Sequence, residues 1–202
     1  MKRRNLVGAM VGAACLWGLA WTGLSAPEPL SPNSIYHLEG SWKDQQGQPF
    51  QLRQLRGQIR VLAMIYATCR GACPTIIHDM QVIESKLSTR ARPRVSFVLV
   101  TIDPGVDTPA RLKELAREKK LTEGRWRLLQ GDTAMIQDLG ALLGFKYRKV
   151  SDTDFAHSNM ITVLDSEGQI IHQQIGLNVD PADTLAAIEK LLASETLPPC
   201  CR

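Results

Sequence analysis

Two cysteines stand four positions apart in the stretch MIYATCRGACPTIIHDM, residues 64–80. Pro74 and an apolar pattern typical of a helix follow Cys73, so we place Cys73 near the start of a helix and Cys69 in the loop before it. Exposed backbone N–H groups and the positive end of the helix dipole lower the pKa of a thiol there. Because the thiolate both binds metals and attacks disulfides, the pair suits either chemistry.

A structural disulfide is the least favoured use of this pair. It would close a loop of only five residues, which removes little entropy from the unfolded chain and therefore stabilises weakly. A thioredoxin-type redox pair usually has two intervening residues and a proline on the facing strand. Here three residues intervene, and no proline stands between Pro109 and Pro181.

A third side chain favours a metal site. The segment DFAHSNM, residues 154–160, begins a predicted hairpin strand, and in a thioredoxin-like topology it passes beside the helix end that carries the cysteines. Two thiolates and one imidazole suit Cu(I), and such a nitrogen and sulfur set also holds Cu(II). Zinc accepts the same three ligands together with a fourth. We therefore predict a metal site at Cys69, Cys73 and His157, with a redox-active cysteine pair as the alternative.

The elements that must position these residues alternate along the chain. Two near-continuous apolar runs, residues 59–67 and 94–103, read as buried strands, each followed by a helical pattern. Asp107 or Thr108 caps the second helix. A predicted hairpin, GSWKDQQGQPFQLRQLRGQ, precedes the first of these strands. After the second helix come, in order, the strand RWRLLQG, the helix TAMIQDLGALLG, the strand FKYRKV, the hairpin NMITVLDSEGQIIHQQIG and the helix DPADTLAAIEKLLAS. This order predicts an α/β, thioredoxin-like mixed sheet flanked by helices, with an N-terminal β-hairpin extension.

Three stretches resemble the signature regions of the SCO/SenC family of copper chaperones: CRGACP, VTIDPGVDTPARLKELA and FAHSNMITVLDSEGQII. The resemblance covers roughly residues 36–193. It implies a thioredoxin-like, usually membrane-anchored protein that assists assembly of the binuclear copper centre in subunit II of cytochrome c oxidase, with copper ligands at Cys69, Cys73 and His157. This chain differs from the family in having Arg70 and Gly71 where Pro-Asp is common, and Ala156 where Asp is frequent.

The expected function is therefore that of a copper chaperone, not an enzyme, which binds one copper ion, Cu(I) or Cu(II), and delivers it to a cytochrome oxidase. One alternative is a thiol–disulfide reductase that keeps a client's copper-ligand cysteines reduced; another is a copper or redox sensor. The expected partners are oxidase subunit II or another cuproprotein client, and a protein that reduces thiols.

Residues 1–25 read as a signal peptide or an N-terminal membrane anchor. Three basic residues precede an uncharged run, 5–24, whose 20 residues approach the ~20 that span a bilayer. Gly23 and Ser25 would allow cleavage after Ser25, and Cys15 only weakly resembles a lipidation site. Each of these readings places the domain on the periplasmic side of the inner membrane, anchored or exported.

The rest of the chain divides into three predicted parts. Residues 26–35 form a proline-rich linker that should add nothing to the core, residues 36–195 form the copper-binding domain, and residues 196–202 form a tail with Cys200 and Cys201. The tail cysteines could recruit a soft metal, pair between molecules or have no role. Beyond residue 4 the chain has 21 basic and 20 acidic residues, so no nucleic-acid partner is expected.

The other chemistry-bearing residues have plainer interpretations. His78 should be solvated on the first helix, and His37 and His172 should be surface residues. We assign Met64, Met80 and Met160 to the core, and Asp103 and Asp107 to turn and capping roles.

Overall fold

The structure is a computed structural model that describes residues 29–195. Seven strands form one sheet in the order β2-β1-β5-β4-β3-β8-β9. Their bounds are β1 Trp42–Asp44, β2 Pro49–Phe50, β3 Ile59–Ile65, β4 Val95–Thr101, β5 Trp126–Gln130, β8 Met160–Leu164 and β9 Ile170–Ile175. A separate two-stranded ribbon pairs β6 (Tyr147–Lys149) with β7 (Phe155–His157). The helices are α1 Ala72–Lys86, α2 Pro109–Glu118, α3 Thr133–Leu143 and α4 Ala182–Glu195, with 3-10 turns η1 Ile35–His37, η2 Leu52–Leu55 and η3 Arg92–Arg94.

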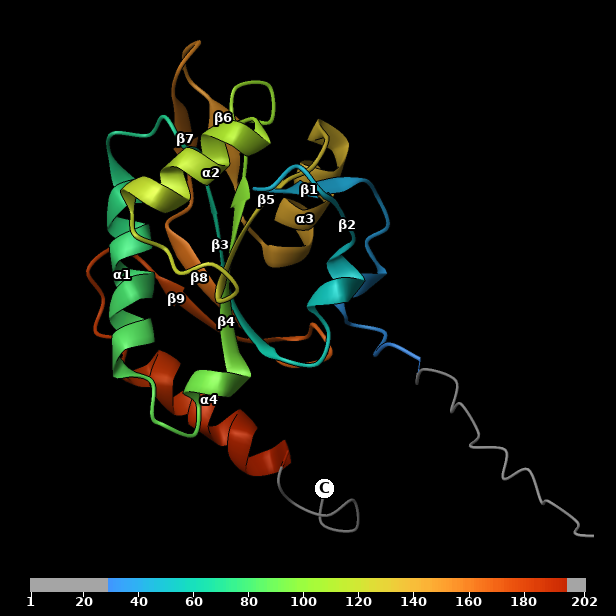
Figure 1. Cartoon of the computed structure of the whole chain (residues 1–202), viewed down its shortest axis with the longest axis vertical. Coiled ribbons are helices and arrows are strands. Elements are labelled where there is room, and N and C mark those ends of the chain that lie inside the picture. Colours follow the sequence, from blue (N-terminus) through green and yellow to red (C-terminus); the bar gives the residue numbers. More distant parts are fainter. Residues whose placement is uncertain (1–28, 196–202) are drawn as a thin grey trace, which may run out of the picture.

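The sheet is mixed, as predicted. Strands β3, β4 and β5 run parallel, while β8 is antiparallel to β3 and β9 is antiparallel to β8. The expected N-terminal hairpin, β1 and β2, extends the sheet beyond β5. Figure 1 shows α1 and α4 on one side of the sheet and α3 on the other. The predicted α/β fold is confirmed.

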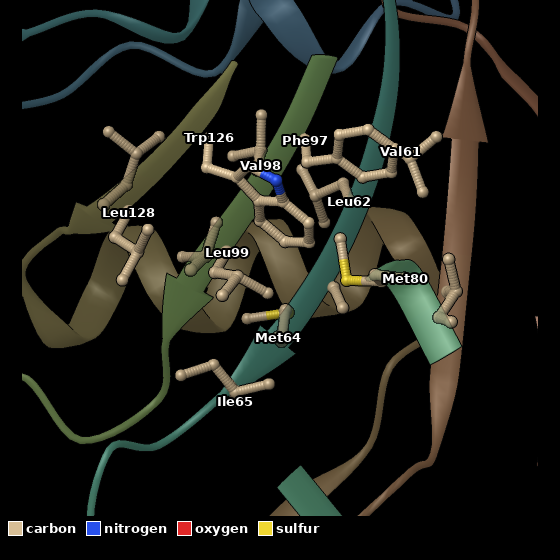
Figure 2. Packing of buried hydrophobic residues seen from close by; sticks show 14 of the residues in the cluster. Val61, Leu62, Met64, Ile65, Met80, Phe97, Val98, Leu99, Trp126 and Leu128 are labelled. Atoms are coloured by element: carbon tan, nitrogen blue, oxygen red, sulfur yellow. The ribbon is translucent and has the colours of Figure 1, made fainter. Parts of the chain in front are cut away.

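The core lies between these layers (Figure 2). Strand β4 is buried along its whole length, which explains its uninterrupted apolar sequence. Phe97 stacks on Trp126 of the neighbouring strand, with ring centroids 4.6 Å apart. Met64 and Met80 are fully buried and fill this core, as their apolar positions predicted. The core fixes the end of β3, from which the cysteine loop departs.

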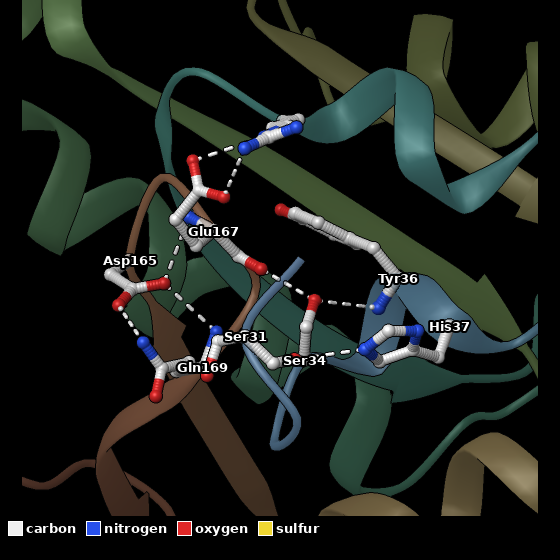
Figure 3. A network of polar contacts seen from close by, with 8 residues as sticks. Ser31, Ser34, Tyr36, His37, Asp165, Glu167 and Gln169 are labelled. Carbon is white, nitrogen blue, oxygen red and sulfur yellow. Dashed lines mark hydrogen bonds and ion pairs between the residues drawn. The ribbon is translucent and has the colours of Figure 1, made fainter. Parts of the chain in front are cut away.

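The segment before β1 is fastened to the turn between β8 and β9 (Figure 3). The Ile35 N–H donates to the Gly168 carbonyl over 3.0 Å, and the Ser34 hydroxyl donates to the Glu167 carbonyl over 2.5 Å. Ile35 is 2% exposed and belongs to the core. The expectation that residues 26–35 add nothing to the core is therefore wrong at the last residues of that range.

The structure settles two further details. The sequence left Asp107 and Thr108 open as the cap of α2, and Thr108 takes this position, because its hydroxyl accepts the Arg111 N–H. His157 ends β7 in the separate ribbon and is not in the hairpin strand β8. Three-residue strands such as β6 and β7 are too short to carry a periodic pattern, which is why the sequence could not separate them from the hairpin.

No helix within residues 29–195 is both long enough and apolar enough to cross a membrane. The predicted signal or anchor, residues 1–25, lies outside the described residues, and so do Cys15, Cys200 and Cys201.

Candidate metal centre

The loop from β3 into α1 holds both cysteines. Gly71 caps α1, so Cys73 is the second residue of the helix and Cys69 lies just before it, as predicted. The Cys69 N–H donates to the Tyr66 carbonyl over 3.2 Å, and the Cys73 N–H points at Cys69 Sγ over 3.4 Å. An otherwise unpaired N–H of the first helical turn thus faces a sulfur atom, which favours its thiolate form.

The β6–β7 ribbon brings His157 to this loop. Its Nδ1 lies 2.9 Å from the Ser158 carbonyl, and its Nε2 lies 3.7 Å from Cys73 Sγ. Because a carbonyl oxygen only accepts hydrogen bonds, Nδ1 carries the proton, and the Nε2 lone pair faces the sulfur. A metal ligand that binds through Nε2 requires this tautomer, and the hydrogen bond from Nδ1 to the Ser158 carbonyl holds it. The sequence offered no signal for the role of Ser158, because a backbone atom supplies it.

The three side chains predicted as ligands converge. Sγ of Cys69, Sγ of Cys73 and a ring nitrogen of His157 all lie within 4.8 Å of one another. Three bonds of about 2.0–2.3 Å spread evenly around one ion put the donor atoms about 3.8–4.0 Å apart, so a contraction of about 1 Å at most closes the site on an ion. Both cysteines are free thiols here, and no structural disulfide joins them.

The two thiols differ in burial and in pKa. Burial raises the pKa of Cys73, which is 2% exposed. Burial also acts to raise the pKa of Cys69, but hydrogen bonding from the Cys73 N–H and the Tyr66 hydroxyl outweighs it, so the net pKa is lowered. The half-buried Cys69 therefore forms a thiolate more readily than Cys73, which keeps its proton.

Tyr66 ties the two halves of the site together, and the sequence reasoning did not single it out. Its ring packs against Phe155, with centroids 5.2 Å apart, and meets His157 edge-on at 5.8 Å. Its hydroxyl donates to Asp154 at the entry to β7. Since Tyr66 leads directly into the cysteine loop, these contacts hold the histidine ribbon against it.

Asp107 supports the same loop from behind. It is completely buried, and its Oδ2 accepts the Ala67 N–H at 2.8 Å and the Thr101 hydroxyl at 2.5 Å. Burial raises the pKa of this carboxyl group. Asp107 therefore does more than occupy a turn: it accepts a loop N–H two residues before Cys69.

Two hollows open on either side of the cysteine loop. One, of about 830 Å³, is lined by the loop and by the ribbon that carries His157. The other, of about 360 Å³, lies between the loop and α2, and both cysteines line it. Cys69 lines both hollows and is therefore open to an incoming molecule from either side.

The remaining sequence candidates lie away from the site or in the core. His78 is exposed on α1, His37 is exposed and bonds the Ser31 carbonyl over 2.9 Å, and His172 is half-buried in β9. Met160 is buried in the core. Within the described residues, the only cluster of metal-ligating side chains found is that of Cys69, Cys73 and His157.

Comparison with known families gives this arrangement its context. The family model described as SCO1/SenC matches residues 36–193, which is most of the chain. The chain belongs to the SCO1/SenC family. This SCO1/SenC protein is 23% identical to the SCO1 protein homolog of Bacillus subtilis over 182 residues, which cover 88% of this chain and 92% of that one. It is 27% identical over 131 residues to a protein of Stutzerimonas stutzeri named for copper binding, and this match covers 63% of either chain.

Solved structures share its fold. The ScoI protein of Arabidopsis thaliana, solved with copper bound, superposes with a TM-score of 0.67 at 19% identity, covering 77% of this chain and 96% of that one. BsSco, described as a member of the Sco family of cytochrome c oxidase assembly proteins with a disulfide switch, superposes with a TM-score of 0.67 at 21% identity, covering 80% and 94%. The thioredoxin-like mixed sheet flanked by helices is thus common to this chain and its relatives.

Proposed function

We propose that this protein binds one copper ion through Cys69, Cys73 and His157 and delivers it to a copper centre of a cytochrome oxidase. The observation that carries the proposal is the convergence of two thiols and one metal-ready imidazole nitrogen within 4.8 Å. Two sulfur donors and one nitrogen donor are the set that soft Cu(I) prefers and that Cu(II) also accepts. The copper-binding relatives and the oxidase-assembly role named for BsSco support copper as the cargo and an oxidase as the client.

The geometry of the site would allow a bound copper ion to be passed on to a client protein. Cys69 is half-buried at the edge of two hollows, so an incoming client ligand can approach the ion from that side while Cys73 and His157 still hold it. Stepwise exchange of ligands needs no fully bare ion at any stage. We place the protein on the periplasmic side of the inner membrane, anchored or exported, on the strength of the basic and apolar residues 1–25.

The difference between the two thiols favours a second candidate, a thiol–disulfide reductase. The Cys69 thiolate would attack a client disulfide and form a mixed disulfide while one client thiolate leaves. Cys73 would then lose its proton and attack Cys69 Sγ, which releases the second client thiol and leaves a Cys69–Cys73 disulfide. Two electrons pass to the client, and a thiol reductant protein would restore the pair.

Anaerobic copper titration of the reduced full chain, beside His157→Ala, tests the first candidate against the second. We expect one copper ion at this site, with His157→Ala retaining appreciable Cu(I) binding but losing the thiolate-to-Cu(II) absorption band, because Cu(II) needs nitrogen or oxygen donors. His78→Ala, which changes an exposed histidine on α1, is the matched control. It should alter neither Cu(I) binding nor the thiolate-to-Cu(II) absorption band. Loss of the band in the His78 variant but not in the His157 variant would refute the assigned ligand.

A further inference from the structure

A hollow at the end of the sheet opposite the cysteines is lined by four arginines. Its volume is about 350 Å³, and its walls come from residues 54–60, the start of β4 and residues 124–127. Arg56, Arg60, Arg125 and Arg127 line it, and its lining in the described part of the chain contains no acidic residue. We refer to it as the arginine hollow.

Three of these arginines are neutralised by carboxylates. The ion pairs are Arg56–Glu167 at 2.7 Å, Arg125–Glu84 at 3.3 Å and Arg127–Asp44 at 2.9 Å. Figure 3 shows the carboxylate of Glu167 paired in this way above the turn that holds the N-terminal segment. These pairs fix the guanidinium groups in place. Arg125 donates from Nε to Glu84 and from Nη1 to the Arg92 carbonyl, and Arg127 donates from Nη1 to Asp44. Both therefore keep N–H donors beyond these bonds, because each guanidinium has five.

Arg60 differs from the other three. Its Nε donates to the Leu55 carbonyl over 2.7 Å, and its Nη1 donates to Gln58 over 3.1 Å and to the Ser96 hydroxyl. All these partners are neutral, and no carboxylate within residues 29–195 pairs with Arg60. Burial and the neighbouring charge of Arg127 both lower the pKa of Arg60. The hollow thus holds one positive charge in excess at its partly buried wall.

We propose that the arginine hollow binds a phosphate group. An anion there would compensate the charge of Arg60 that the protein leaves unpaired. A planar guanidinium fork forms two parallel hydrogen bonds with a carboxylate or with a phosphate, but the two oxygens of a carboxylate accept mainly in one plane. The tetrahedral oxygens of a phosphate group can instead accept from several guanidinium groups that surround one space. The phosphate could belong to a soluble molecule or to the headgroup of an anionic phospholipid.

This site is separate from the metal centre. Arg60 lies at the start of β3 and the cysteine loop follows its end, so five residues of strand, about 16 Å, stand between them. Phosphate binding should therefore leave the absorption spectrum of bound copper unchanged, and loss of copper binding should leave phosphate binding intact.

Calorimetric titration of the full chain in a non-ionic detergent tests the proposal. The probes are inorganic phosphate and a short-chain phosphatidylglycerol, with the zwitterionic short-chain phosphatidylcholine as headgroup control. Arg60→Gln removes the unpaired charge. Arg117→Gln is the matched control, because it makes the same change at an exposed position on α2 outside the hollow. We expect one phosphate group per chain, bound at least about ten-fold more weakly by Arg60→Gln and unchanged in Arg117→Gln.

Each outcome of these titrations either supports or overturns the proposal of a phosphate site. Saturable binding of inorganic phosphate that depends on Arg60 supports a soluble phosphate ligand; Arg60-dependent binding of phosphatidylglycerol alone supports a lipid headgroup. Binding of neither probe, or equal weakening in both variants, overturns the proposal. If circular dichroism shows that Arg60→Gln does not fold, Arg125→Gln takes its place, since the side chain of Arg125 is 30% exposed at the rim; it must then weaken binding more than Arg117→Gln does.

Discussion

The hydroxyl of Tyr66 has one proton and two acceptors, Asp154 and the Cys69 sulfur. A hydrogen bond to a thiolate lowers the pKa of the thiol, so Tyr66→Phe should raise the pKa of Cys69 toward its ordinary value while keeping the ring in place. We expect the rate of Cys69 alkylation near neutral pH to fall about three- to ten-fold.

Measuring that rate against pH shows whether the pKa itself has moved. Tyr147→Phe is the matched control, because Tyr147 packs against Phe155 on the same ribbon, with centroids 6.4 Å apart. Equal slowing in both variants would mean that the ribbon has loosened and that the Tyr66 hydroxyl has no specific role.

The raised pKa of Cys73 gives copper uptake a pH dependence. A raised pKa means that the thiol is protonated at neutral pH in the metal-free protein, so binding must expel that proton. The apparent affinity for Cu(I) should therefore increase with pH, by about ten-fold per unit for each proton released, until pH passes the pKa. Competition with a Cu(I) chelator between pH 6 and about pH 8 measures how the affinity changes with pH. An affinity that does not change over this range would exclude Cys73 as a ligand.

At the scale of elements, the loop between β3 and α1 depends on the loop between β4 and α2 through Asp107. Replacing Asp107 with alanine leaves the buried Ala67 N–H and Thr101 hydroxyl without their acceptor, which should lower the free energy of unfolding by roughly 2–4 kcal/mol. Asp107→Asn keeps an acceptor and should cost less. Urea unfolding of both variants measures the difference.

The same carboxyl group has a pKa raised by burial, so its ionised form is disfavoured in the folded state. Its contribution is therefore greatest below the pKa of the unfolded chain and is lost as pH rises through the folded pKa. The wild type should lose stability relative to Asp107→Asn as pH rises from below about 4 toward neutral. If the difference in stability between the two proteins stayed constant across that range, the carboxyl group of Asp107 would not have a pKa raised by burial.

Sequence periodicity predicted the elements that are long and buried. Strands β3 and β4 lie within the predicted apolar runs, and α1 begins beside Cys73 as its position before Pro74 indicated. The three-residue strand β7 could not be read in this way, although it carries His157. The histidine itself was predicted from the place of its segment in a thioredoxin-like topology and from the family resemblance, neither of which depends on the short ribbon that carries it.

Contacts that depend on tertiary packing were out of reach. Nothing in the local sequence pairs Tyr66 with Asp154, 88 positions away, or brings Ile35 onto Gly168. Arg60 likewise stands in an apolar run, where only the fold brings it beside Arg125 and Arg127. Such contacts join residues that are far apart in sequence, so no local spacing pattern predicts them.

At the scale of the whole molecule, the state of the cysteine pair should control copper uptake. Only thiolates bind the ion, so a protein with a Cys69–Cys73 disulfide should take up no copper at this site, while the reduced chain binds one equivalent. Mass spectrometry of both forms after desalting measures this. Equal uptake by the oxidised and reduced chains would show that the pair is not the site.

The tail offers a separate test of the chain as a whole. If Cys200 and Cys201 bind a soft metal, the double substitution to serine should lower the copper capacity of the reduced chain and leave the spectrum of the first site unchanged. Identical capacity in the two proteins would mean that the tail cysteines bind no copper under these conditions.

Because β3 runs from the arginine hollow at one end to the cysteine loop at the other, two sites of different chemistry stand at opposite ends of one strand. An electrode coated with phosphate groups should hold the molecule by the arginine hollow and so present the thiols to the bulk solution. Voltammetry of such an adsorbed layer would then follow a copper ion held about 16 Å or more from the conducting surface, where electron transfer is slow. Attachment to gold through Cys69 would reverse the orientation and occupy a ligand, so the two films of one protein should differ in current and in the copper that they retain.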